Sequence, residues 1–349
     1  MPVIQENELK KQITQAAFAP LYVLYGEEKY LLAKAAGLLT RKAAGDSFAE
    51  FNLNEFGSQA PIDKIADAAQ ALPLMAQRKC VTVSDWNPEE KNQTELKKLY
   101  ELWDDLSDST VLIFAYPTAE TGRKPSAKWK AFLKKAAEKG AVTEFRPRGA
   151  AELTKRLIRE AEKRGCLLSK NNAERLVSYA GSDLKTLMNE LEKLAAFAGG
   201  QEITRESMEL LVAKNTETTV FLMTDALTAG QYEKAYQLMH QLLEGGEEPV
   251  AVLAALSSAY VDMMRVKAAI QSGLSASAAG EYGEYRGREF RLRKAERSAR
   301  ELSMDVLRES LAILLDTDVA LKSSRAQAAV LMDTLIARLL LCAKGERAS

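Results

Sequence analysis

The sequence predicts an α/β domain with a mostly parallel sheet, followed by two all-α domains. Short β-rich runs alternate with helical stretches as far as residue 146, and this alternation is typical of a parallel sheet covered by helices. Pro147 and Gly149 mark a linker, and only helical patterns follow it. Aromatic residues make up 7% of the chain, and Gly and Pro number 19 and 9, which argues against a sandwich or barrel.

The first 146 residues contain five candidate strands separated by helices. The fourth strand is continuously apolar, as expected when helices cover both faces of a sheet. The first strand stops at Gly26, where a helix begins. We expect strands at 20–25, 48–53, 80–83, 110–114 and 142–145, and helices at 30–35, 62–72, 96–106 and 129–137.

Two helical domains follow. Gly165, Ser182 and Thr204 are of residue types that end or cap helices, and they punctuate four short helices. The later helices show no fixed repeat of 20–50 residues, which favours a bundle over a solenoid. The helices are expected at 152–164, 172–180, 184–195, 204–212, 220–229, 231–244, 249–272, 288–302, 304–321 and 327–341. The predicted domains are therefore 1–146, 147–212 and 213–349.

Charge and cysteine content narrow the class of protein. Lys and Arg number 48, as do Asp and Glu, so no global charge attracts nucleic acid or an acidic membrane. Cys80, Cys166 and Cys342 lie far apart without a CxxC motif, which indicates reduced thiols. We see no signal-peptide pattern and no apolar run near the ~18 residues of a membrane span. A soluble, cytoplasmic protein without a membrane partner is expected.

Side chains for common catalytic chemistry are missing. His240 is the only histidine, and its helical surroundings predict a surface or boundary position rather than a base or ligand. A single histidine and scattered cysteines exclude a zinc site, a Ser-His-Asp triad and a Cys-His pair. We therefore expect no catalytic residue, no metal and no cofactor.

The segment after the first strand stands where a phosphate-binding loop would lie. Such a loop needs GxxxxGK[ST], so that backbone N–H groups and a lysine hold the phosphates. This segment has one glycine, Gly26, and two carboxylates, Glu27 and Glu28, where phosphate needs positive charge. Asp85 follows the third strand without the Glu that would polarise water. Nucleotide hydrolysis is not expected.

Four segments, in this order and spacing, carry a resemblance. They are PLYVLYGEE at 20–28, LPLMAQRK at 72–79, GSDLKTLMNELEKL at 181–194 and DTDVALK at 316–322. Over almost its whole length the chain resembles the delta subunit of the bacterial DNA polymerase III clamp loader. The resemblance implies a degenerate AAA+ (RecA-like) module, a helical lid and a helical collar. It also implies a subunit of the DNA-directed DNA polymerase holoenzyme that opens the sliding clamp during DNA replication and does not hydrolyse ATP.

The resemblance implies a clamp contact at Leu74 and Met75, which follow Leu72 and Pro73. In such proteins an exposed apolar pair just after the second helix of the first domain binds the clamp, and its second residue is more often aromatic. Pro73 interrupts the helix, and an unbranched Met adapts to an apolar pocket on a partner. The alternative is that Leu74 and Met75 pack beneath their own loop.

A second candidate site is the basic run at 286–300. It contains seven basic and two acidic residues in a domain that is otherwise net acidic. The resemblance places primer–template DNA near this region, and the candidate contacts are Phe290, Arg293 and Lys294. The alternative is a solvated helix face paired with Glu289, Glu296 and Glu301.

The collar carries much apolar surface, for instance Leu335, Ile336, Leu339, Leu340 and Leu341. Assembly with the gamma/tau and delta prime subunits, which the resemblance implies, would explain this surface, and so would ordinary core packing. Two other functions stay open at this point. One is an active AAA+ ATPase with an atypical phosphate loop, and the other is a scaffold or nucleic-acid-binding protein outside replication.

Overall fold

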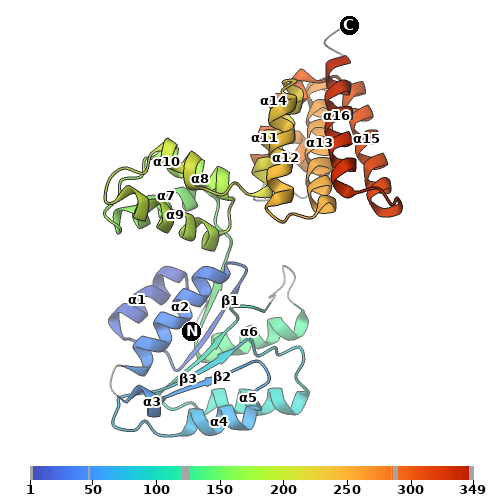
Figure 1. Ribbon diagram of the computed structural model, residues 1–349. Coiled ribbons are helices and arrows are strands. Elements are labelled where there is room, and N and C mark those ends of the chain that lie inside the picture. The colour runs from blue at the N-terminus through green and yellow to red at the C-terminus, as the bar shows by residue number, and fades with distance from the viewer. Residues whose placement is uncertain (1–2, 46–47, 120–125, 284, 286–289, 346–349) are drawn as a thin grey trace. The chain divides into compact units, whose positions relative to one another are not determined.

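The structure is a computed structural model that describes residues 3–45, 48–119, 126–283, 285 and 290–345 (Figure 1). The chain divides into two compact units, residues 1–148 and 149–349. Unit 1 is an α/β unit, and unit 2 contains helices and no strand among its described residues. The predicted fold class is therefore confirmed, whereas the division of unit 2 at residue 212 stays a prediction.

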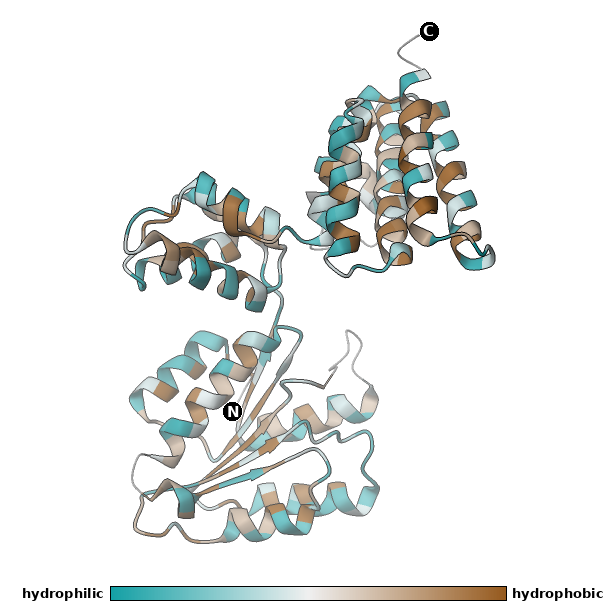
Figure 2. Cartoon of the chain, viewed as in Figure 1, coloured by the Kyte–Doolittle hydropathy of each residue, from teal (hydrophilic) through white to brown (hydrophobic). Residues whose placement is uncertain are grey.

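Unit 1 is built on one sheet of five parallel strands in the order β2-β3-β4-β1-β5. Every residue of β4 is buried, and so is every residue of β1 except Tyr25, so these strands form the middle of the core. Figure 2 shows the apolar residues that run along the strands. The strands are β1 (Leu21–Gly26), β2 (Leu53–Phe56), β3 (Lys79–Ser84), β4 (Thr110–Ala115) and β5 (Ala141–Phe145).

Helices cover both faces of this sheet. α4, α5 and α6 pack with Val81, Leu112 and Phe114 in one core cluster. Because side chains alternate along a strand, Cys80 and Ile113 face the other side, where α1 and α2 lie against β3, β4 and β5. The helices are α1 (Glu6–Gln15), α2 (Lys29–Ala44), α3 (Ala49–Asn52), α4 (Ile62–Gln70), α5 (Gln93–Asp104) and α6 (Ala127–Lys139).

The predicted strand at 48–53 is wrong. α3 occupies most of this segment, and β2 begins only at Leu53. Phe48 adopts a left-handed conformation with φ +58°, and the buried Asn52 side chain donates to its carbonyl, so the chain closes into one helical turn. Helix 62–72 also ends early, at Gln70, and α1 has no counterpart in the sequence analysis.

Unit 2 consists of short helices followed by longer ones. Thr204 caps α10 by accepting a hydrogen bond from the Ser207 N–H, which confirms the predicted cap. The predicted cap at Ser182 is wrong, because the neighbouring Asp183 caps α9 by accepting from the Thr186 N–H at 2.7 Å. The helices are α7 (Ala150–Glu162), α8 (Lys170–Ala180), α9 (Leu184–Ala198), α10 (Arg205–Leu211), α11 (Thr216–Thr228), α12 (Tyr232–Glu244), α13 (Pro249–Gln271), α14 (Phe290–Glu301), α15 (Met304–Ser323) and α16 (Ala328–Gly345), with a 3-10 turn at Ala276–Tyr282.

The helices from α11 to α16 share one hydrophobic core, and α13 lies within it. It packs against α11, α14 and α15 and buries Leu253, Leu256 and Tyr260. By length and composition alone α13 is apolar enough to cross a membrane, contrary to the expectation that no stretch comes near this. The core contacts account for its apolar character, and the helix also carries Asp262 and Arg265.

Two glycines of unit 1 allow a matched test of the fold. Gly26 has φ +133°, and a Cβ there would lie 2.2 Å from the Phe145 carbonyl oxygen. We expect Gly26→Ala to lower the free energy of unfolding by about 2–4 kcal/mol. Gly37→Ala, in the interior of α2 with open space around it, is expected to raise it by about 0.5–1 kcal/mol.

Urea unfolding followed by tryptophan fluorescence measures both changes. All three tryptophans of the chain lie in unit 1, so this signal reports on the sheet and not on the helical unit. Equal stability of the two variants would contradict the predicted role of Gly26.

Candidate functional site

An exposed apolar loop joins α4 to β3. Within this loop, residues 71–78, the exposed fractions are 81% for Leu72, 51% for Leu74 and 77% for Met75. A loop that packed these side chains beneath itself would hide them from water. The structure therefore favours the exposed pair over the buried alternative.

Local sequence explains why the chain leaves the helix here. α4 buries Ile62, Ile65 and Ala69 on one face and ends at Gln70. Ala71 is already extended, and Pro73 has no N–H to continue the helical ladder. Met75 has φ +50°, a conformation that is costly for a side chain of this size and needs support from its surroundings.

Asn52 provides that support from a neighbouring segment. Its side chain is fully buried, and its Oδ1 accepts a hydrogen bond from the Leu74 N–H at 2.7 Å. Its Nδ2 donates to the carbonyl oxygens of Leu74 at 2.8 Å and Phe48 at 3.0 Å. One amide therefore satisfies both backbone groups of Leu74 and ties the loop to the turn that precedes β2.

The hydrogen bonds of Asn52 hold a second apolar segment, residues 48–51, beside the 71–78 loop. Phe48 and Phe51 are both exposed, and the buried Lys79 side chain donates to the Phe51 carbonyl at 2.9 Å. Because β2 and β3 are parallel neighbours that start side by side, α3 and the 71–78 loop share the amino edge of the sheet. We call Phe48, Phe51, Leu72, Leu74 and Met75 the amino-edge apolar surface; exposed apolar side chains gathered in this way mark interaction sites.

Sequence reasoning found Leu72–Met75 and missed Asn52, Phe48 and Phe51. The strand expected at 48–53 concealed them, because alternation along a strand gives no reason to single out Asn52. The available signal was Asn52 itself, since Asn is uncommon in strands and favours turns.

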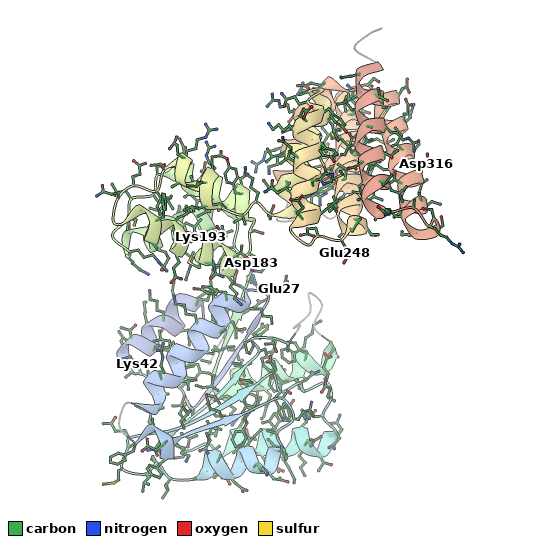
Figure 3. The ribbon with its side chains drawn as sticks, viewed as in Figure 1. Glu27, Lys42, Asp183, Lys193, Glu248 and Asp316 are labelled. Carbon is green, nitrogen blue, oxygen red and sulfur yellow. The ribbon has the colours of Figure 1, made fainter. Side chains whose placement is uncertain are left out.

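The opposite edge of the sheet holds the residues compared with a phosphate-binding loop. Figure 3 shows Glu27 at the carboxyl end of β1. The Lys29 Nζ donates to the carbonyl oxygens of Tyr116 at 3.0 Å and Ala119 at 2.5 Å. This lysine is thus bonded to the backbone of the segment that follows β4.

Asp85 is bonded to the same segment. Its carboxylate accepts hydrogen bonds from the Thr118 N–H at 3.1 Å, the Thr118 hydroxyl at 2.7 Å and the Ala119 N–H at 2.8 Å. Lys29, in the segment after β1, and Asp85, after β3, therefore both hold the protein's own backbone.

His240 and the cysteines have separate surroundings. His240 is half-buried, its Nε2 lies 2.9 Å from the Asp333 carboxylate, and its ring packs against that of Tyr236 at a tilt of 36°. Cys80 and Cys166 are buried and unpaired, and burial raises the pKa of the Cys80 thiol to about 12. In the described part of the chain no three His, Cys, Asp or Glu side chains gather as a metal site would require.

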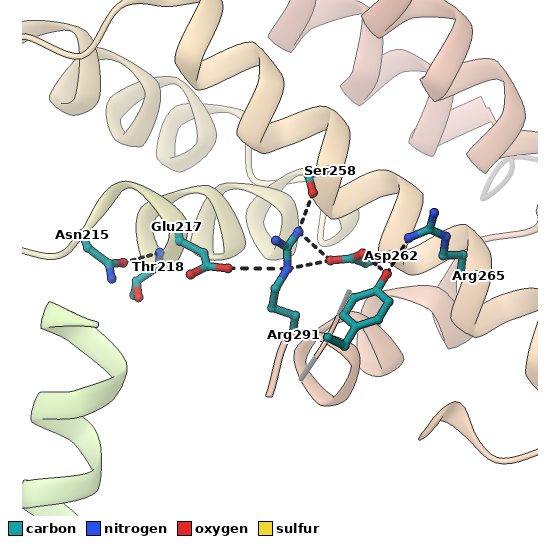
Figure 4. A network of polar contacts seen from close by, with 8 residues as sticks. Asn215, Glu217, Thr218, Ser258, Asp262, Arg265 and Arg291 are labelled. Carbon is teal, nitrogen blue, oxygen red and sulfur yellow. Dashed lines mark hydrogen bonds and ion pairs between the residues drawn. The ribbon is translucent and has the colours of Figure 1, made fainter. Parts of the chain in front are cut away.

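One residue of the basic run, Arg291, forms ion pairs within unit 2 (Figure 4). The Arg291 guanidinium lies 2.7 Å from the buried Asp262 carboxylate and 3.5 Å from Glu217. The Tyr285 hydroxyl donates to the same Asp262 carboxylate, and Arg265 donates to Tyr285 at 2.9 Å. Arg291 therefore joins α14 to α13 and α11 and is unsuited to bind phosphate.

The three predicted DNA contacts, Phe290, Arg293 and Lys294, differ in their surroundings. Lys294 lies with its Nζ 4.9 Å from the centre of the Phe221 ring, and burial lowers its pKa against the opposing effects of Glu217 and Asp225. Arg293 is exposed. Residues 286–289 and the side chain of Phe290 lie outside the described residues.

The described remainder of the run, Arg297 and Arg300, fits the solvated-face alternative. Arg300 pairs with Glu296 at 2.6 Å, and Arg297 lies 4.0 Å from Glu301. Of the two predicted contacts whose side chains are described, Arg293 is exposed and Lys294 is partly buried.

The apolar residues singled out in α16 belong mostly to the core. Leu335, Ile336, Leu339 and Leu340 are buried, and Leu341 is exposed. Leu315, Val319 and Val330 are exposed on α15 and α16, so the described part of unit 2 does carry apolar surface beyond its core.

Comparisons with known proteins agree over both units. The family described as "DNA polymerase III, delta subunit" matches residues 22–143, and "DNA polymerase III delta subunit, C-terminal domain" matches residues 217–339. The DNA polymerase III subunit delta of Bacillus subtilis is 24% identical and covers 95% of each chain. That of Escherichia coli is 24% identical over 92% of this chain and 91% of its own.

A solved structure supports the fold. The chain is similar to the Bacillus subtilis DNA clamp loader delta protein, with a TM-score of 0.60 and 23% identity over 96% of this chain and 99% of that one. The two family matches together span more than half of the sequence. The chain belongs to the family of the DNA polymerase III delta subunit, a component of the clamp loader.

Proposed function

We propose that this subunit binds the sliding clamp, the beta subunit, through the 71–78 loop and favours the opened ring. The observation that carries the proposal is the exposure of Leu72, Leu74 and Met75 on a loop whose backbone is fixed by Asn52. A soluble chain that exposes three large apolar side chains on one fixed loop gains by burying them in a partner.

The loop can supply a useful free energy. Full burial of Leu74 and Met75 in an apolar pocket contributes about 1.5–3 kcal/mol for each side chain. A binding partner opens the ring only by as much as it prefers that state over the closed one. Clamp opening is therefore differential binding, and it needs no reaction at this subunit.

The first experiment compares wild type with Leu74→Ala/Met75→Ala for binding to the clamp of the same organism. We expect a loss of about 2–4 kcal/mol, a rise in Kd of roughly 30- to 1,000-fold, because truncation removes most of the buried apolar area. Leu315→Ala/Val319→Ala, an exposed apolar pair on α15, is the matched control. Folding is checked by circular dichroism, and an unchanged Kd in the folded loop variant would sink this site.

We infer further that the subunit neither hydrolyses ATP nor acts as an enzyme on its own. The bonds of Lys29 to Tyr116 and Ala119 support this, as do the bonds of Asp85 to the same segment. A nucleotide would have to displace these contacts and accept Glu27 and Glu28 beside its phosphates. The energy for loading then comes from ATP-binding partners.

Calorimetric titration with ATP and Mg²⁺ tests this directly. We expect no saturable binding up to millimolar ATP and no phosphate release above buffer, because the loop lacks a second glycine and GK[ST]. An ATP-binding loader subunit serves as the positive control. Saturable binding would favour the rival hypothesis of an active ATPase.

The remaining contacts that we propose lie in unit 2. The exposed Leu315, Val319, Val330 and Leu341 fit association with the gamma/tau and delta prime subunits. Within that assembly the exposed Arg293 contacts the phosphates of primer–template DNA. We place the subunit in the cytoplasm, as its role in replication requires.

Arg293→Ala tests the DNA contact in the assembled loader. We expect weaker binding to primed DNA and a fall of about one in the slope of log K against log salt, since one phosphate contact is lost. Arg308→Ala on α15, also exposed, removes the same charge elsewhere in unit 2. Identical salt slopes for both variants and wild type would rule out Arg293 as a contact.

A further inference from the structure

The conformations around Asn52 are unusual for the residues that adopt them. Among the described residues, four positions other than glycine have a positive φ, and Phe48 and Met75 are two of them. Both are large, exposed apolar residues with no local hydrogen-bonding side chain of their own to favour this region. Such conformations persist only where the surroundings determine them, and they gather at functional sites.

Asn52 lies between these two positions. Its Nδ2 bonds to the Phe48 carbonyl itself and to the carbonyl of Leu74, the residue before Met75. Its Oδ1 holds the Leu74 N–H. Since the side chain is completely buried, these three bonds do not compete with water.

We propose that Asn52 is a positioning residue for clamp binding. It holds Leu74 and Met75 in one presented conformation and joins the Phe48 turn to them, so the amino-edge apolar surface exists before the clamp arrives. This inference rests on the proposed clamp contact at Leu74 and Met75. Asn52 itself, being buried, touches no partner.

Preorganisation has a measurable effect on affinity. A loop that samples many conformations binds only through its competent fraction, and the apparent Kd rises in proportion as that fraction falls. Leu74 loses both backbone hydrogen bonds to a side chain when Asn52 becomes Ala. We expect Asn52→Ala to raise the Kd for the clamp about tenfold.

A matched control separates positioning from general stability. Asn92 caps α5, with its side chain accepting from the Glu95 N–H at 2.9 Å and its own N–H donating to Glu95 at 2.9 Å. Asn92→Ala also removes a structural asparagine from unit 1, but α5 begins after the carboxyl end of β3, away from the loop. Its Kd for the clamp is expected to stay within about twofold of wild type.

Two further readouts follow the loop itself. In the absence of clamp, hydrogen exchange of the Leu74 amide is expected to be slow in wild type and Asn92→Ala and fast in Asn52→Ala. In the Leu74→Ala/Met75→Ala background, adding Asn52→Ala is expected to cause no further loss of binding. A merely structural role for Asn52 would weaken binding in both backgrounds alike.

The outcomes are distinguishable. If Leu74→Ala/Met75→Ala loses binding while Asn52→Ala binds like wild type, the clamp site stands and the positioning role is overturned. If wild type fails to bind, or the loop variant binds normally, the proposed function is wrong and this inference falls with it.

A second variant covers the case in which Asn52→Ala does not fold. Asn52→Asp keeps an acceptor for the Leu74 N–H but loses the donor to the carbonyls of Phe48 and Leu74. It is expected to weaken clamp binding as well, and wild-type affinity in this variant would likewise overturn the proposal.

Discussion

The hydrogen bonds of the Asn52 side chain determine the shape of the amino edge of the sheet. A carboxamide carries both a donor and an acceptor, so it satisfies the N–H and the C=O of Leu74 as a neighbouring strand would. The 71–78 loop is thereby fixed without joining the sheet. Leu72, Leu74 and Met75 keep their side chains in solvent because no strand or helix needs them for packing.

In this sheet the candidate binding surface lies at the amino edge and not at the carboxyl edge. In open parallel sheets, ligands bind outside the carboxyl ends of the strands. Here Lys29 and Asp85 hold the segment after β4 at that edge, so their polar groups serve the fold. Five exposed apolar residues of the sheet domain, Phe48, Phe51, Leu72, Leu74 and Met75, lie instead near the start of β2 and β3, and such surfaces mark interaction sites.

Sequence patterns predicted most of the long helices and strands. They failed where contacts between residues far apart in the sequence determine the local structure. The buried strands β1, β3, β4 and β5 followed from apolar runs, and the short edge strand β2 did not, because Asn52 bonds across 22 residues to Leu74. The exposed loop was predicted through the resemblance. Within the basic run, the charges looked alike in sequence, and only the packing of α14 on α13 shows that Arg291 is bound to Asp262.

A fixed loop suits the clamp-binding role proposed above. Under the proposed function, the work available to open the ring is the difference in binding free energy between the open and the closed clamp. Every conformation that the loop must give up on binding weakens its binding to the clamp. The strained backbone at Phe48 and Met75 lowers the stability of the sheet domain, but its buried core offsets this cost during folding. Under that proposal the loop is ordered before the clamp binds, so little of the binding free energy of its apolar contacts is lost to ordering it.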